Sequence, residues 1–257
     1  NVRHLPRFFD YSTELSYSKI ERVTDVNDIN HPAIREAMKY LDMQEIRLTY
    51  EADLPARSGL GTSSSFAVGM LNAFYALKGK YADKRKLADD AIYLERVLCN
   101  ESGGVQDQIA AAFGGLNFIR FHQDGEVSVA PVVMKPETYH ELQKNLVMFY
   151  TGDTRSANSI LKEQKNNMGA EEKTANLRQM CALAEDMLVA LEKNQIDSFG
   201  DLLNEGWKLK RTLASGISNP HIDEAYEIAM KNGALGGKLL GAGGGGFLLF
   251  YCPPQEQ

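Results

Sequence analysis

The sequence has few cysteines, no excess of positive charge and no long hydrophobic run. Its three cysteines, Cys99, Cys181 and Cys252, are far apart and odd in number, which excludes a complete disulfide framework. We therefore expect a reducing, cytoplasmic setting. The formal net charge of -6 argues against nucleic acid or an anionic membrane as a partner. No apolar run reaches the roughly 18 residues of a membrane helix, and we expect no signal peptide.

Two further absences concern motifs and chain ends. The sequence has no Gly-Lys-Ser/Thr triplet, which excludes a phosphate loop of the Walker type. It begins at Asn1 rather than Met and stops shortly after Pro253-Pro254. We expect that both ends have lost sequence.

Hydrophobic periodicity indicates a mixture of strands and helices in a chain of 257 residues. The predicted strands cover residues 46–54, 116–121, 127–133, 146–150 and 247–252. The predicted helices cover residues 67–77, 87–98, 177–191, 202–213 and 222–230. Because the two types do not alternate strictly, we predict an α+β fold rather than a doubly wound sheet. The pattern changes near residue 140, which predicts two domains, 1–140 and 141–257.

A loop rich in glycine and hydroxyl groups lies between the first predicted strand and helix. Glycines let the backbone approach a ligand, and the helix start offers free N–H groups that suit phosphate. A turn with one serine as N-cap is the alternative, but it explains four consecutive hydroxyl residues poorly. We therefore predict phosphate binding, with a hydroxyl available to Mg²⁺, by Gly59, Leu60, Gly61, Thr62, Ser63, Ser64 and Ser65.

A second glycine run, residues 241–246, matches the dinucleotide pattern G-x-G-x-x-G. That fingerprint must follow a strand and open a helix. Here we expect a helix before the run and a strand after it, so the dinucleotide interpretation is rejected. Close packing of the backbone against a ligand or another loop explains the run better than a plain turn does.

Two acidic residues are candidates for catalysis. Asp107 follows the Gly103-Gly104 turn and is either the N-cap of a short helix over 109–113 or a carboxylate that accepts a hydroxyl proton during phosphoryl transfer. Glu95 lies on a predicted helix and, taken alone, is typical of a solvated helix charge.

Together these segments resemble the GHMP kinases, the superfamily of galactokinase, homoserine kinase and mevalonate kinase. The similarity covers residues 46–252. Its motifs lie in residues 55–65, which resemble P-x-x-x-G-L-G-S-S-A-A, in 103–107 with Gly114-Gly115, and in the glycine motif 238–246. The resemblance implies an N-terminal domain like the second domain of ribosomal protein S5 and a ferredoxin-like C-terminal domain.

Within the superfamily, residues 59–65, 103–115 and 150–157 resemble D-glycero-D-manno-heptose 7-phosphate kinases, and the last stretch also resembles L-fucose kinases. The resemblance implies transfer of a phosphoryl group from ATP to a small-molecule sugar phosphate, giving heptose 1,7-bisphosphate. Asp107 would accept the anomeric proton, and Ser63 with Glu95 would hold Mg²⁺. The substrate-binding residues would be Gly104, Asp107, Asp153, Arg155, Gly243 and Gly244. For Arg155, an ordinary surface position stays open, as does the oligomeric state, with a homodimer as one alternative.

The sequence departs from the family pattern in two places. The N-terminal motif R-x-P-x-R, which supplies a strand and charge near the substrate, is absent, and Ser64-Ser65 replaces Ala-Ala. We therefore expect either that the first strands are missing from this sequence or that the chain cannot work alone. The alternatives are an L-fucose or other sugar 1-kinase, a decarboxylase of the superfamily, and a sugar sensor without catalysis. A sensor has no need of Asp107 and Ser63.

Overall fold

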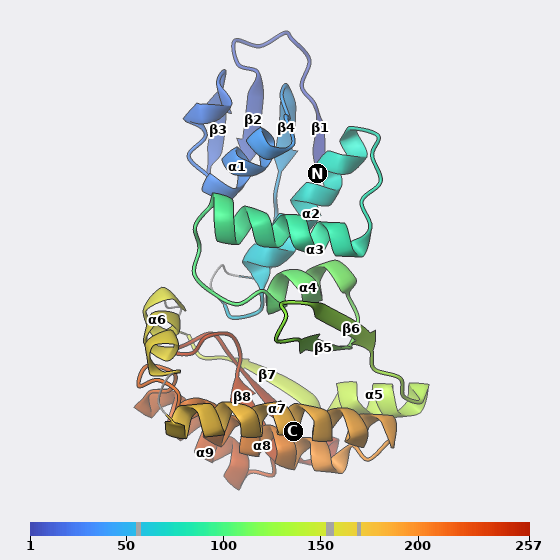
Figure 1. Ribbon diagram of the computed structural model, residues 1–257, viewed down its shortest axis with the longest axis vertical. Helices are drawn as coiled ribbons and strands as arrows, with labels where there is room; N and C mark the ends of the chain where they lie inside the picture. The colour runs from blue at the N-terminus through green and yellow to red at the C-terminus, as the bar shows by residue number, and fades with distance from the viewer. Residues whose placement is uncertain (55–57, 153–156, 169–170) are drawn as a thin grey trace. The chain divides into compact units, whose positions relative to one another are not determined.

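The computed structural model describes residues 1–54, 58–152, 157–168 and 171–257 (Figure 1). The predicted substrate residues Asp153 and Arg155 lie outside these ranges. The chain forms two compact units. The N-terminal unit comprises Asn1–Ala56 and Gly61–Gly114, and the C-terminal unit comprises Arg57–Leu60 and Gly115–Gln257. The predicted boundary near residue 140 refers to family domains and stays a prediction.

The N-terminal unit is a four-stranded sheet with helices over one face (Figure 1). The strand order is β1 (Val2–His4), β4 (Ile46–Thr49), β2 (Thr13–Ser16) and β3 (Ile20–Val23), with only β2 and β4 parallel. The helices are α1 (Pro32–Tyr40), α2 (Thr62–Leu77) and α3 (Lys84–Ile92), and a 3-10 turn η1 (Val26–Asp28) precedes α1. Ile46 and Leu48 alternate toward the core and pack with Leu71 and Phe74 of α2, as their periodicity predicts.

A π-helical segment changes the direction of side chains after α3. This segment, η2 (Tyr93–Leu98), buries Leu94 and Glu95 together. The Gly103-Gly104 turn and α4 (Gln106–Phe113) follow, and α4 packs on α2 and α3. π-Helical turns occur frequently at functional sites, and here the turn directs a carboxylate into the interior.

The C-terminal unit contains a β-hairpin, a second sheet and five helices among the described residues. The hairpin joins β5 (Asn117–Phe121) to β6 (Val127–Pro131), and the antiparallel sheet has the order β7 (Leu146–Tyr150), β9 (Phe247–Tyr251) and β8 (Gly236–Leu239). The helices are α5 (Pro136–Asn145), α6 (Ala157–Asn167), α7 (Glu171–Glu192), α8 (Asp197–Arg211) and α9 (Pro220–Lys231), and η3 (Pro254–Glu256) ends the chain. Helix α8 packs against β8 so closely that a Cβ on Gly236 would lie 1.8 Å from the carbonyl oxygen of Gly200.

The structure confirms the α+β class and corrects two predictions. The glycine run 241–246 follows strand β8 rather than a helix, so it connects two antiparallel strands. Asp107 is not an N-cap, because α4 begins at Gln106 and Val105 occupies the cap position. Among the described residues, we find no helix with the length and hydrophobicity needed to cross a membrane.

Candidate active site

Glu95 is the centre of a hydrogen-bonded cluster in the N-terminal unit. Glu95 is buried, with only 2% of its surface exposed. The Ser63 hydroxyl donates to Glu95 Oε1 over 2.6 Å, and the Ser64 hydroxyl donates to Oε2 over 2.8 Å. The side-chain amide of Gln108 also donates to Oε2. The interpretation of Glu95 as a solvated helix charge is therefore wrong, since a buried carboxylate requires such donors.

The two serines differ in their access to ligands. Ser64 is buried, whereas Ser63 is exposed at the start of α2. A hydroxyl and a carboxylate side by side are oxygen ligands of the kind Mg²⁺ takes, usually with phosphate oxygens and water completing its shell. The described residues contain no group of three His, Cys, Asp or Glu side chains that could hold a metal without other ligands. Ser63 and Glu95 thus fit an ion that is shared with a phosphate.

The first turn of α2 has no side-chain cap. Gly61 occupies the N-cap position with φ of 67°, and within the described part of the chain no side-chain hydrogen bond caps the first N–H groups. The alternative of a serine N-cap is therefore wrong, because Ser63 and Ser64 direct their hydroxyls to Glu95. The N–H groups and the positive end of this helix dipole are suited to an anion.

Asp107 lies against the start of this helix. It occupies the first turn of α4, and a Cβ placed on Gly61 would lie 3.5 Å from its Cγ atom. Loss of solvation raises the pKa of Asp107 above its usual value, the negative charge of Glu95 raises it further, and Arg96 lowers it. A carboxylate with a raised pKa is a stronger base than an ordinary aspartate.

Arg96 holds the turn that leads to Asp107. Its Nη2 and Nε atoms donate to the carbonyl oxygen of Gly104 over 2.7 and 3.1 Å. Its Nη1 atom donates to the carbonyl oxygens of Ser102 and Glu101 over 3.4 and 3.5 Å. The predicted substrate residue Gly104 is thus engaged through its carbonyl. The sequence reasoning missed Arg96, which follows Glu95 in the π-helical segment.

In the C-terminal unit, backbone contacts fix the glycine run 241–246. Gly246 N–H donates to Thr151 Oγ1 over 3.0 Å, and Thr151 N–H donates to the Gly246 carbonyl over 2.9 Å. Gly244 N–H donates to the carbonyl of Ile217 over 3.0 Å. A Cβ on Gly59 would lie 2.9 Å from the carbonyl oxygen of Leu240. The run therefore packs closely against another loop, which confirms that part of the sequence interpretation.

The predicted phosphate and glycine-loop residues are divided between the two units. Gly59 and Leu60 lie in the C-terminal unit with Gly243 and Gly244, and residues 61–65 lie in the N-terminal unit with Glu95 and Asp107. Gly243 packs on Ile217, whose Cα would lie 2.6 Å from a Cβ added there.

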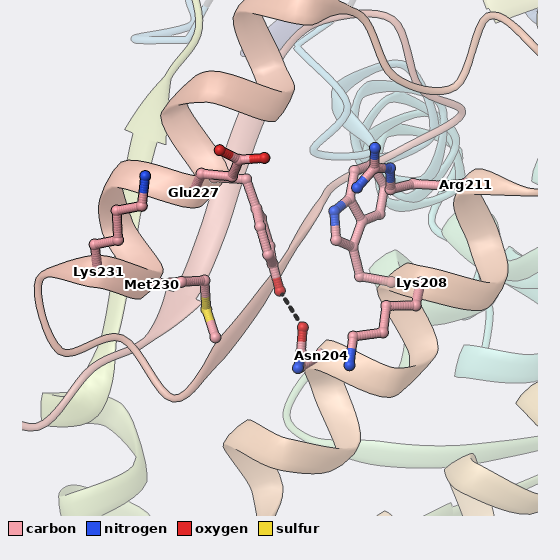
Figure 2. Close-up of a pocket in the computed structure, with 8 residues that line it drawn as sticks. Asn204, Lys208, Arg211, Glu227, Met230 and Lys231 are labelled. Carbon is pink, nitrogen blue, oxygen red and sulfur yellow. Dashed lines mark hydrogen bonds between the residues drawn. The ribbon is translucent and has the colours of Figure 1, made fainter.

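A separate hollow of about 380 Å³ lies between α8 and α9 (Figure 2). Asn204 and Lys208 on α8 face Glu227, Met230 and Lys231 on α9. Some of its polar groups have partners within the protein: Tyr226 donates a 2.8 Å hydrogen bond to Asn204, and Lys208 lies 2.6 Å from Glu205. No predicted site residue lines this hollow.

A helix start with free N–H groups and a hydroxyl-rich loop is suited to binding phosphate. The chain belongs to the GHMP kinases. The model of the GHMP kinases N terminal domain matches residues 29–115, and the model of the GHMP kinases C terminal domain matches residues 187–257. This confirms the family that the sequence motifs resemble.

Individual relatives include sugar kinases. The chain is 34% identical over 209 residues to D-glycero-alpha-D-manno-heptose 7-phosphate kinase of Campylobacter jejuni, covering 80% of this chain and 61% of that protein. It is 32% identical over 234 residues to L-fucokinase/L-fucose-1-P guanylyltransferase of Bacteroides fragilis, covering 86% of this chain and 24% of that protein. The chain thus spans less than two thirds of these curated relatives.

A solved structure agrees over almost the whole chain. The crystal structure of a D-glycero-D-manno-heptose 1-phosphate kinase from Bacteroides thetaiotaomicron superposes with a TM-score of 0.74 at 26% sequence identity. The match covers 99% of this chain and 76% of that one.

Proposed function

We propose that this protein is an ATP-dependent sugar kinase that phosphorylates the anomeric hydroxyl of D-glycero-D-manno-heptose 7-phosphate to the 1,7-bisphosphate. The observation that carries the proposal is the arrangement around the start of α2. There Ser63 is bonded to the buried carboxylate of Glu95, and Asp107 lies against Gly61. The similarity to the heptose 7-phosphate kinase supports this choice of sugar.

Phosphoryl transfer requires positioning and neutralisation of charge more than covalent chemistry. Backbone N–H groups of residues 59–65 would hold the phosphates of ATP. Ser63 and Glu95 would hold Mg²⁺, which neutralises charge on the β- and γ-phosphates when bound. The anomeric oxygen would form a bond to the γ-phosphorus while the bond from that phosphorus to the β,γ-bridging oxygen breaks. ADP leaves, and Asp107 takes the hydroxyl proton.

The sugar side of the proposal rests on the resemblance. Asp153 and Arg155 would contact the sugar phosphate, for which Arg is suited by its two-pronged geometry. Gly104, Gly243 and Gly244 would approach the sugar through their backbone. The reaction would take place in the cytoplasm, where the free thiols of Cys99, Cys181 and Cys252 would stay reduced.

A second candidate is an L-fucose or related sugar 1-kinase. The 32% identity to L-fucokinase/L-fucose-1-P guanylyltransferase favours it. The two candidates differ in their dependence on a substrate phosphate, because fucose carries none.

The test is an ADP-coupled assay of the purified chain with Mg-ATP and three acceptors: heptose 7-phosphate, unphosphorylated heptose and L-fucose. We expect turnover with heptose 7-phosphate alone, and none in the Asp107→Asn variant. Turnover with L-fucose but not with heptose 7-phosphate would replace the first candidate by the second. Absence of turnover with all three would exclude both heptose 7-phosphate and L-fucose as substrates of this chain.

A further inference from the structure

Two lysines next to the glycine run have no acidic partner among the residues that the structure describes. Lys210, on α8, donates from Nζ to the carbonyl oxygens of Gly241 over 2.6 Å and Leu239 over 3.2 Å. Lys238 lies on β8, immediately before Leu239. In the part of the chain that the structure describes, no carboxylate forms an ion pair with either lysine. Both lie in the C-terminal unit.

The neighbours of Lys210 on the same helix behave differently. Lys208 Nζ lies 2.6 Å from Glu205, and Arg211 Nη2 lies 3.0 Å from Asp223. Both of these cations are more exposed at the helix surface than Lys210. The chain also carries 34 acidic residues. The absence of a carboxylate at Lys210 is therefore a local property, and it coincides with the glycine run.

The environment makes two positive charges unfavourable in the free protein. Loss of solvation, together with the smaller effect of the nearby charge of Lys238, lowers the pKa of Lys210 to about 7. Loss of solvation also lowers the pKa of Lys238. Carbonyl oxygens stabilise an ammonium group but bring no negative charge, so neither lysine is neutralised. A bound anion would restore both charges.

We propose that Lys210 and Lys238 form a binding site for a phosphate monoester at the edge of the glycine run 241–246. An ammonium group has three donors, and the two carbonyls leave one on Lys210 for a ligand. The backbone of Lys238 pairs with Leu249 in the sheet, but among the described residues its side-chain ammonium has no hydrogen-bond partner, so the Nζ donors are available.

The proposal deepens the proposed function, on which the identity of the ligand rests. The phosphate bound at this place would be the monoester of the sugar substrate or, as the other outcome of the test, the terminal phosphate of the nucleotide. The role is distinct from that predicted for Arg155, because Lys210 reaches the glycine run from α8, outside the sequence motifs.

The first experiment measures anion binding without catalysis. Lysine Nζ resonances are followed by NMR in a titration with inorganic phosphate. We expect phosphate to raise the pKa of Lys210 from about 7 by roughly one unit or more, because the bound anion favours the charged form. Lys238→Met should weaken phosphate binding about 10- to 100-fold, as expected for a lost charge-assisted contact. Lys208→Met on the same helix should bind phosphate like the wild type.

Lys210→Met removes a donor from two carbonyls and could unfold the loop, so Lys210→Arg is measured with it. Trp207, the only tryptophan of the sequence, reports whether each variant is folded. The proposal is overturned if phosphate leaves the pKa of Lys210 unchanged and if the wild type and Lys238→Met bind phosphate with equal affinity.

The second experiment identifies the source of the phosphate and separates this proposal from the proposed function. The Michaelis constants for heptose 7-phosphate and for ATP are measured in Lys238→Met. If the constant for heptose 7-phosphate rises at least about tenfold and that for ATP does not, the site binds the sugar phosphate. If only the constant for ATP rises, the site binds the nucleotide. Unchanged constants for both overturn the site even if the chain is a kinase. Phosphate binding that depends on both lysines supports the site even if no kinase activity is found.

Discussion

The hydroxyl of Ser63 donates a 2.6 Å hydrogen bond to Glu95, and this contact joins the start of α2 to the buried carboxylate of the π-helical segment. If the pair holds Mg²⁺, Ser63→Ala should raise the Mg²⁺ concentration needed for half-maximal activity and lower the maximal rate. Titration of the rate with Mg²⁺ at saturating ATP measures both effects.

Ser64→Ala is the matched control for this prediction. Ser64 is bonded to the other oxygen of Glu95 but is buried, so its loss should leave the metal requirement nearly unchanged. It should instead cost about 1–3 kcal/mol in the free energy of unfolding, because a buried carboxylate loses a donor. Equal Mg²⁺ dependence in Ser63→Ala and wild type would assign the metal to another hydroxyl, such as that of Thr62.

Asp107→Asn should remove most of the turnover and leave the affinity for ATP nearly intact. The amide keeps the shape of the carboxylate beside Gly61 but cannot accept a proton. Loss of a general base typically costs about 100- to 10,000-fold in rate. Single-turnover rates and ATP binding are measured in parallel, and a rate near that of the wild type would leave Asp107 without a catalytic role.

The raised pKa of Asp107 predicts the pH dependence of the reaction. A base acts when deprotonated, so activity should fall as the pH drops through the pKa of Asp107, at a higher pH than for an ordinary aspartate. Because Arg96 lowers this pKa, Arg96→Gln should raise it and move the acidic limb of the pH profile of kcat/KM to higher pH. Arg96→Lys keeps the charge and should leave the limb in place.

The two Arg96 variants also separate electrostatics from structure. Both variants lose the paired Nε and Nη2 hydrogen bonds to the Gly104 carbonyl. If Arg96 has a purely structural role, the rate should therefore fall in both variants at every pH. Titration of the sugar phosphate itself is common to all variants and cancels in the comparison. A limb that does not move in Arg96→Gln would show that Asp107 does not control it.

The sequence predicted those elements whose side chains repeat regularly. Ile46 and Leu48 alternate along β4, and the apolar residues of α2 follow helical spacing, so both were found. Strand β8 was missed because Gly236 and Gly237 have no side chains to give a pattern. That omission placed a helix directly before the glycine run.

The sequence predicted which types of residue form the candidate site but not which of them contact one another. Hydroxyls after glycines indicated phosphate and metal binding, but no spacing shows that Ser63 and Ser64 share one carboxylate. Arg96 and Lys210 were missed, since each acts on backbone carbonyls and leaves no sequence signal. Contacts of this kind depend on tertiary structure.

Arg155→Ala tests the sequence-based assignment of the sugar phosphate. If this side chain binds the phosphate, the Michaelis constant for heptose 7-phosphate should rise roughly 10- to 150-fold, with that for ATP almost unchanged. Arg155→Lys should recover only part of the affinity, because Lys cannot make a two-pronged contact. Sugar constants equal to the wild-type value in both variants would make Arg155 an ordinary surface residue.

Thr151→Val should loosen the glycine run at its attachment to β7. The Thr151 hydroxyl accepts a 3.0 Å hydrogen bond from Gly246 N–H and donates a 3.0 Å hydrogen bond to the Gly246 carbonyl. In the valine variant that carbonyl still has a donor, because the backbone N–H of Thr151 binds it over 2.9 Å. Valine has nearly the same shape, so the main loss is a partner for one buried N–H group. That loss typically costs about 1–3 kcal/mol in the free energy of unfolding.

Thr151→Ser keeps the hydroxyl and is the control for this change. Denaturation followed by the fluorescence of Trp207, which is buried in the same unit, measures the stability of both variants. If the run also approaches the sugar, Thr151→Val should raise the Michaelis constant for the sugar and Thr151→Ser should not, because only valine leaves Gly246 N–H unpaired. Equal stability of the two variants would mean that the contacts of Gly244 with Ile217 and of Gly241 with Lys210 hold the run without Thr151.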